Sequence, residues 1–257
     1  MSTRKVPLFN LQFDAIGLGD AAQLVTDISR ATARNLVMPV NVDVLMQIQE
    51  DAELREICKS AAVLLADGMP IVWMSRFLGV PLPERVTGAD LLPEICRFAA
   101  TSGARVFFMG GQPGAAAETA RRLSIRHPEL IVAGTVCPPF GFEEDPVESA
   151  RIVSQINESH VHILFIGVGA PKQEKWIARH RGQLSVGSAI CVGAAFDFAA
   201  GYVTRAPKFL RSAGLEWAWR LGKEPRRLWR RYILRDAAFF RLAIRSLLTS
   251  RPHDDRC

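Results

Sequence analysis

Four loops of the chain combine glycine with polar side chains that could do chemistry. Asp67 follows a short apolar run and precedes Gly-Met-Pro, and Gly110–Gly114 forms a glycine-rich turn. Gly169–Glu174 adds a cation, an amide and a carboxylate, and Asp197 lies among small residues. A carboxylate can act as a general base, and a glycine turn that opens a helix offers free N–H groups to a phosphate. Together the four loops indicate a ligand site.

Each loop also has a purely structural interpretation. Asp67 could cap a helix N-terminus, and Asp197 could be a buried acid that accepts backbone N–H groups. The glycines at 110, 111 and 114 do not spell the dinucleotide fingerprint G-x-G-x-x-G. Lys172 and Glu174 would by default form a solvated first helical turn. The residues alone leave these alternatives open.

The elements that must position these loops alternate along the chain. Apolar runs predict six strands, at Leu36–Val42, Ala62–Ala66, Arg105–Met109, Leu130–Val136, His162–Gly167 and Ala189–Gly193. Helical patterns fall at Asp20–Arg34, Asp43–Lys59, Met69–Leu78, Ala89–Ser102, Gly114–Arg126, Pro146–Ser159 and Lys172–His180. This order predicts an α/β fold, a Rossmann-like and mostly parallel sheet with helices on both faces. Ligands of such folds bind at the carboxyl ends of the strands, where the four loops lie.

Charge divides the chain into unequal parts. Residues 205–251 carry eleven Arg and two Lys against three acids, a net of +10, so the remainder of this +6 chain has a net of −4. On a helix over Leu228–Leu248, aromatic and aliphatic residues share one half and five arginines the other. We expect a catalytic body at 1–204, a basic amphipathic helical appendage at 205–250, and a disordered tail at 251–257. The appendage suits an anionic membrane surface or, alternatively, a homo-oligomer interface.

Several classes of protein and of site are disfavoured by the sequence. No apolar run reaches the roughly 18 residues that a membrane span needs, and the N-terminus has no signal-peptide pattern, which favours the cytoplasm. The five Cys and five His show no metal-ligand spacing. A nucleic-acid-binding protein would use the basic segment equally well, but two Tyr and five Trp supply few base-stacking platforms.

Read together, the loops resemble the WecG/TagA/CpsF family of bacterial glycosyltransferases, glycosyltransferase family 26. The resemblance runs from about residue 10 to residue 248 in the family's order. It rests on the following stretches: Ala66–Pro70, Arg85–Leu91, Gly110–Gly114, Gly167–Glu174, Gly193–Asp197, Arg205–Pro207, Gly214–Trp217, Arg220 and Glu224–Tyr232.

The resemblance implies an enzyme that moves a sugar from a UDP-sugar, with inversion, onto a polyprenyl-diphosphate-linked sugar. It places the enzyme in exopolysaccharide or cell-envelope glycan assembly, peripheral on the inner face of the cytoplasmic membrane. Members have a Rossmann-like body and a basic appendage that reaches the membrane. A non-catalytic nucleotide-sugar or nucleic-acid binding protein is the alternative from another class.

The resemblance also implies roles for individual residues. Asp67 matches the family's catalytic aspartate, and Arg85 and Gln173 are expected to contact substrate or nucleotide. Gly111, Lys172 and Asp197 are expected at the UDP pocket. The appendage would add cations that stabilise the departing diphosphate, namely Arg220, Arg227, Arg230 and Arg231. No Asp-x-Asp triplet occurs and arginine pairs bidentately with phosphate, so we expect neither a metal nor another cofactor.

One position departs from the family pattern. Where members usually carry Thr two residues before an Asn near the acceptor, this chain reads Pro39-Val40-Asn41. Proline supplies neither a hydroxyl nor an N–H, so the acceptor contact is expected to differ. Asn41 is included as a substrate-binding candidate. On this difference UDP-glucose is the preferred donor, with UDP-N-acetylmannosamine and UDP-N-acetylmannosaminuronate as alternatives.

Overall fold

The computed structural model describes residues 3–31, 33–207, 210, 216–223, 239 and 242. Its centre is a parallel sheet of six strands in the order β4-β3-β8-β7-β5-β6. The strands are β3 (Asn35–Val40), β4 (Val63–Ala66), β5 (Arg105–Gly110), β6 (Ile131–Val136), β7 (Ile163–Gly167) and β8 (Ser188–Cys191). All but the edge strand β6 are buried almost throughout, because helices cover both faces.

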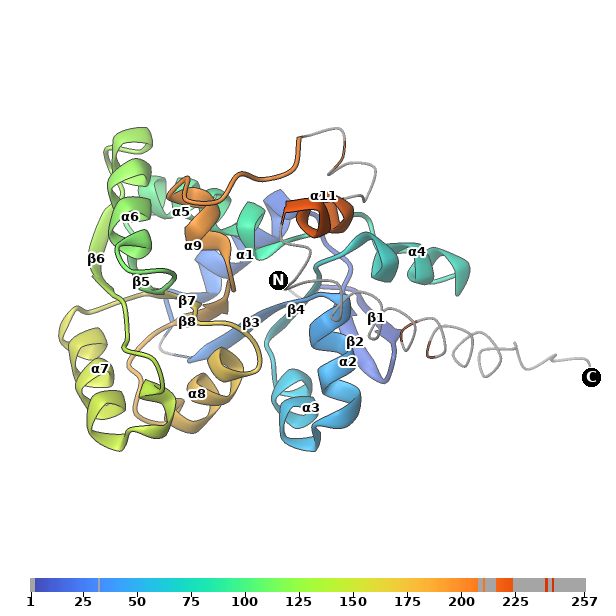
Figure 1. The fold of residues 1–257 in the computed structure, drawn as a ribbon, viewed down its shortest axis with the longest axis horizontal. Helices are drawn as coiled ribbons and strands as arrows, with labels where there is room; N and C mark the ends of the chain where they lie inside the picture. The colour runs from blue at the N-terminus through green and yellow to red at the C-terminus, as the bar shows by residue number, and fades with distance from the viewer. Residues whose placement is uncertain are drawn as a thin grey trace, which may run out of the picture.

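The helices divide between two hydrophobic cores, one on each face of the sheet (Figure 1). One face holds α1 (Leu18–Ile28), α5 (Gly88–Ser102), α6 (Ala115–Arg126) and α9 (Ala195–Ala199). The other holds α2 (Val42–Glu50), α3 (Ala52–Lys59), α7 (Pro146–Glu158) and α8 (Lys172–His180), together with residues of α4 (Met69–Phe77). The structure also describes the 3₁₀ turn η1 (Phe142–Glu144) and α11 (Glu216–Lys223). The predicted α/β architecture is confirmed.

A two-stranded hairpin, β1 (Lys5–Leu8) and β2 (Leu11–Asp14), packs beside the edge strand β4. The buried Asp14 carboxylate accepts the Leu64 N–H at 2.7 Å and pairs with Lys5 Nζ at 2.8 Å. An edge strand otherwise presents unpaired N–H groups, so this carboxylate satisfies one of them. The sequence analysis missed the hairpin.

From β3 across to β6, neighbouring strands lead to helices on opposite faces of the sheet, whereas β3 and its other neighbour β4 lead to helices on the same face. β3 leads to α2 on one face, whereas its neighbour β8 leads to α9 on the other. β3 pairs with β4 through Val40 but with β8 only through Val37. Pro39, which has no N–H, therefore lies where β3 has stopped pairing with β8. A strand order that diverges in this way is where ligands bind in open α/β sheets.

Three predicted elements need correction. The helix expected over Asp20–Arg34 already ends at Ile28. The helix expected over Asp43–Lys59 is two helices, because Asp51 adopts an extended conformation and its side chain accepts the Leu54 N–H to begin α3. The last strand ends at Cys191 instead of Gly193, and Ala195–Ala199 is a short helix that was not predicted. At Asp51 and after Cys191, a local cap or turn interrupts an apolar pattern that looked continuous.

Most of the predicted appendage and tail lies outside the described residues. The exceptions in its amphipathic part are Phe239, whose ring centroid lies 5.8 Å from that of Phe9, and Leu242, which packs on the same core. The boundary at 204/205 stays a prediction. Within the part of the chain that the structure describes, no helix combines the length and apolarity needed to cross a bilayer.

Candidate active site

Asp67 lies at the carboxyl end of β4, directly beside the end of β3. Its N–H donates to the Val40 carbonyl at 2.9 Å, which extends the ladder between the two strands by one residue. The side chain is partly buried at the N-terminus of α5. Burial raises the pKa of Asp67 to about 6, against the opposing effects of the Arg85 charge and the Gly88 N–H. A carboxyl group of this kind can accept a proton near neutral pH.

Arg85 stands beside this carboxyl within a network of ion pairs. Arg85 Nη1 lies 3.0 Å from Glu216 Oε2, and Arg85 Nη2 lies 3.9 Å from Asp90 Oδ2. Arg205 makes a bidentate pair with Asp90, at 2.7 and 3.2 Å, and its Nε lies 3.6 Å from Glu216 Oε1. We call these four residues, together with Asp67, the charge cluster. Three carboxylates thus share two guanidinium groups.

The sequence analysis missed Asp90, Arg205 and Glu216 as members of the site, although all three stand in the stretches that carry the family resemblance. Asp90 occupies the third position of α5, where its N–H donates to the Thr87 capping hydroxyl at 3.1 Å. The pattern Thr-x-x-Asp therefore predicts only a helix start. Arg205 and Glu216 reach Asp90 and Arg85 across 115 and 131 residues of sequence, and no periodicity marks such pairs.

Asn41 lies next to Asp67 at the end of β3 and caps α2. Its Oδ1 accepts the Val44 N–H at 3.0 Å, while its Nδ2 makes no hydrogen bond to any part of the chain that the structure describes. The amide group is therefore fixed in direction and keeps its two donors. The structure brings this predicted substrate-binding residue close to Asp67.

Gly111 and Asp197 also lie together, but in loops whose polar groups bind each other. The Gly111 N–H donates to the Gly167 carbonyl at 2.9 Å, and the Gln112 N–H donates to Asp197 Oδ1 at 3.1 Å. A Cβ on Gly110 would lie 2.6 Å from the Gly167 oxygen, so the glycines here permit close packing of two loops. The first two N–H groups of this turn, expected to be free for a phosphate, are thus used within the protein.

Lys172 and Gln173 begin α8, after β7. Lys172 pairs with Glu143, and its Nζ lies 4.7 Å from the centre of the Phe140 ring. It lines a cavity of about 210 Å³ with the following residues: Glu143, Glu144, Pro171, Lys175, Trp176 and Arg179. Gln173 is 4% exposed and donates from Nε2 to Glu174 Oε1 at 2.7 Å. Its Oε1 has no hydrogen-bond partner among the residues that the structure describes. None of these contacts joins Lys172 or Gln173 to the charge cluster.

The four arginines predicted to meet the diphosphate are not placed by side chain. Arg220 belongs to α11, but its side chain, like the whole of Arg227, Arg230 and Arg231, lies outside the described residues. Among the residues that are described, no group of three or more His, Cys, Asp or Glu has a geometry that could hold a metal ion. The cations placed beside Asp67 are Arg85 and Arg205.

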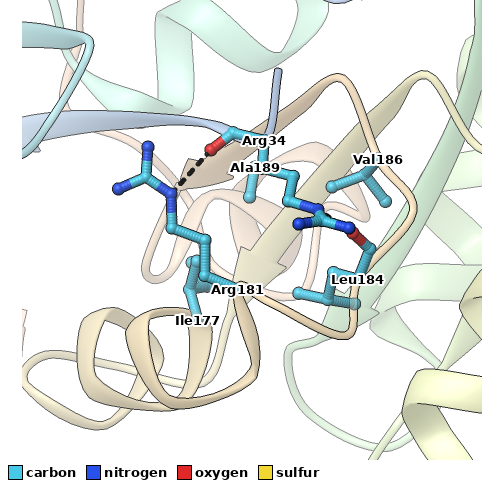
Figure 2. A pocket seen from close by; sticks show the side chains of 6 residues that line it. All are labelled: Arg34, Ile177, Arg181, Leu184, Val186 and Ala189. Atoms are coloured by element: carbon cyan, nitrogen blue, oxygen red, sulfur yellow. Dashed lines mark hydrogen bonds between the residues drawn. The ribbon is translucent and has the colours of Figure 1, made fainter. Parts of the chain in front are cut away.

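A second hollow lies at the amino end of the strands, where β3 and β8 begin (Figure 2). Two arginines close it with backbone contacts: Arg34 Nε donates to the Leu184 carbonyl at 2.9 Å, and Arg181 Nε donates to the Arg34 carbonyl at 3.0 Å. It has no room for a water molecule. This hollow joins elements of the fold and is not a candidate ligand site.

Comparison with known proteins agrees with this geometry. The sequence profile of the WecG/TagA/CpsF family of glycosyl transferases matches residues 6–253, nearly the whole chain. A curated relative from Bacillus spizizenii (strain ATCC 23059 / NRRL B-14472 / W23), N-acetylglucosaminyldiphosphoundecaprenol N-acetyl-beta-D-mannosaminyltransferase, is 30% identical over 197 residues. The alignment covers 77% of this chain and 74% of the relative. The chain therefore belongs to the WecG/TagA/CpsF family and is a glycosyltransferase.

Proposed function

We propose that the chain transfers N-acetylmannosamine from a UDP-sugar to the sugar of a polyprenyl-diphosphate-linked acceptor, with inversion at the anomeric carbon. The observation that carries the proposal is Asp67, a carboxyl with a pKa of about 6 at a strand end beside Arg85, in a chain of this family. The relative's name supplies the sugar and the lipid-linked acceptor. It favours N-acetylmannosamine over the glucose preferred from the sequence, which becomes the alternative donor.

In the proposed reaction, Asp67 takes the proton of an acceptor hydroxyl as that oxygen attacks the anomeric carbon. The bond from that carbon to the diphosphate oxygen breaks, and UDP leaves with the electron pair. Negative charge grows on the diphosphate, so guanidinium groups near the reacting centre lower the barrier. Arg85 and Arg205 are the described cations closest to this role, and the appendage arginines are proposed to add to it. A metal ion is not required in this scheme.

The location of the reaction belongs to the same proposal. An acceptor with a polyprenyl chain stays in the bilayer, so its sugar has to be met at the membrane surface. We place the enzyme on the inner face of the cytoplasmic membrane and assign the basic residues of 205–250 to that contact. Truncation after Gly222 tests this assignment: liposome flotation is expected to be lost while the oligomeric mass is unchanged. A changed mass with intact flotation would instead assign the segment to self-association.

The test of the activity is UDP release from a panel of UDP-sugars, with EDTA present, with and without a short-chain prenyl-diphosphate-linked N-acetylglucosamine acceptor. Acceptor-dependent release with UDP-N-acetylmannosamine is the expected result. Release with UDP-glucose instead would overturn the donor assignment, and release only after a divalent metal is restored would overturn metal independence. No release with any donor, from folded protein that binds UDP, would contradict the acceptor assignment.

A further inference from the structure

Glu216 reaches the candidate site from a part of the chain far from it in sequence. It begins α11, after the sheet and its covering helices are complete. Its carboxylate is 17% exposed, and both of its oxygens face guanidinium groups, Oε2 that of Arg85 at 3.0 Å and Oε1 that of Arg205 at 3.6 Å. This partly buried carboxylate therefore restrains the side chains of both Arg85 and Arg205, whereas a solvent-exposed ion pair would leave them mobile.

The partners of Glu216 are themselves held from the other side. Arg205 is locked by its bidentate pair with Asp90, and Asp90 also receives the Thr87 hydroxyl at 2.7 Å. Arg85 is 14% exposed and lies 3.9 Å from the same Asp90 carboxylate. The contact of Arg85 with Glu216, at 3.0 Å, is shorter than its contact with Asp90.

We propose that Glu216 is a positioning residue for the transfer reaction, which holds Arg85 beside Asp67 and sets the electrostatic field in which Asp67 takes up its proton. The inference rests on the proposed function, in which Asp67 is the base. It assigns the segment beyond the sheet a role at the reacting centre that is separate from contact with the membrane. Glu216 itself touches no substrate atom in this scheme.

The sign of its effect follows from the charges that face Asp67. These are Arg85 and Arg205, which favour the ionised carboxylate, and Asp90 and Glu216, which oppose it. Glu216 is therefore one of the groups that keep the pKa of Asp67 above its ordinary value. With Arg85 still kept beside Asp67 by Asp90 and by the Gln amide, removing the Glu216 charge makes Asp67 a weaker base that stays ionised at lower pH.

The experiment measures the turnover of the full chain between pH 5 and pH 8.5, for wild type and for Glu216→Gln. The variant is expected to lose about fivefold in kcat on the plateau, because an amide holds Arg85 less strongly than a carboxylate. The acid limb of its pH–rate profile, where turnover falls as Asp67 becomes protonated, is expected to move to lower pH by a few tenths of a unit or more. Glu216→Asp, which keeps the charge, is expected to restore the wild-type limb.

Glu56→Gln provides the matched control. Glu56 is an exposed carboxylate on α3 that pairs with the exposed Lys59, and α3 leads into the opposite end of β4. The same change of charge there is expected to leave both the plateau and the limb at wild-type values. Thermal unfolding of all the variants verifies that each is folded at the assay temperature.

The outcomes separate this inference from the proposed function. A lower plateau with an unmoved acid limb, in folded protein, would reduce Glu216 to a purely structural residue and overturn the inference. A limb that moves to higher pH would overturn it as well. Wild-type protein without any transfer at all would contradict the proposed function. The effect of Glu216→Gln on the pKa of Asp67 would then be measured directly, by NMR titration of the carboxyl carbon.

Discussion

The carboxyl edge of the sheet consists of two halves that use their polar groups differently. At the ends of β3 and β4, side chains carry the polarity: Asp67 and the ion pairs of the charge cluster gather there. At the ends of β5 and β7, backbone carries it, because Gly110 and Gly167 allow two loops to touch and to satisfy each other. We call these the charged half and the glycine half.

The difference separates two kinds of sequence signal that look equally functional. A glycine-rich turn before a helix suggests an anion site, yet here its first N–H groups are already used to close the loops. A carboxylate after a strand suggests a helix cap, yet Asp67 lies in a cluster of charges that alters its pKa. Chemistry is thus expected mainly from the charged half, and stability from the glycine half.

Asp67→Asn is the substitution with the largest expected effect on rate. Removing the proposed base should lower kcat by about 10²–10⁴-fold while the affinity for UDP changes little, because the amide has nearly the same shape. Steady-state turnover and calorimetric UDP titration measure the two quantities. Asp20→Asn, an exposed carboxyl in the first turn of α1, is the matched control and should keep full activity. Unchanged turnover of Asp67→Asn would remove Asp67 as the base.

Gly110→Ala is expected to lower the stability of the glycine half strongly. Its backbone has φ of +111°, and the added methyl group would lie 2.6 Å from the Gly167 carbonyl oxygen, which belongs to the backbone and cannot turn aside. We expect a loss of about 3 kcal/mol in the free energy of unfolding. Gly103→Ala, at φ of +70° with no atom within 4 Å, is the control and should cost only about 1 kcal/mol. Equal losses in denaturant titrations would contradict the close-packing argument.

The raised pKa of Asp67 predicts that Asp67→Asn, which lowers the rate, increases the stability of the folded chain. Its folded pKa of about 6 lies above the ordinary value of 3.8, so its contribution to stability is complete below about pH 4 and is lost as the pH rises through 6. Asp67→Asn has no such loss. Relative to wild type it should gain up to about 1 kcal/mol between pH 5 and pH 8, a value reduced for partial burial. Urea unfolding at the two pH values measures the gain, and its absence would contradict the raised pKa.

The sequence predicted the sheet well because its buried strands are apolar at nearly every position, as in Val63–Ala66 and Ile163–Gly167. It missed the hairpin because two four-residue strands give too little alternation, and because Phe9 and Asn10 form its turn with positive φ without any glycine. It joined α2 and α3 because the cap at Asp51 looks like any polar residue on a helix.

The candidate site divides in the same way. Asp67 could be placed at the carboxyl edge of the sheet because it follows a strand, whereas its nearness to Asn41 depends on the pairing of β3 with β4. Glu216 could not be placed, because its contact with Arg85 depends on how the chain returns after the last strand. Local patterns therefore reached the residues at strand ends, whereas the ion pairs that surround them required the tertiary structure.

The smallest predicted effect is that of Asp197→Asn, the same substitution made in the glycine half. Asp197 Oδ1 accepts the Gln112 N–H at 3.1 Å, and an Asn side chain offers a carbonyl oxygen to the same donor. We expect turnover within about threefold of wild type, since a neutral acceptor still closes the loop. A tenfold or larger loss in kcat, with unchanged thermal stability, would show that the Asp197 charge acts on the substrate. The glycine half would then take part in the chemistry, and the division between the two halves would have to be withdrawn.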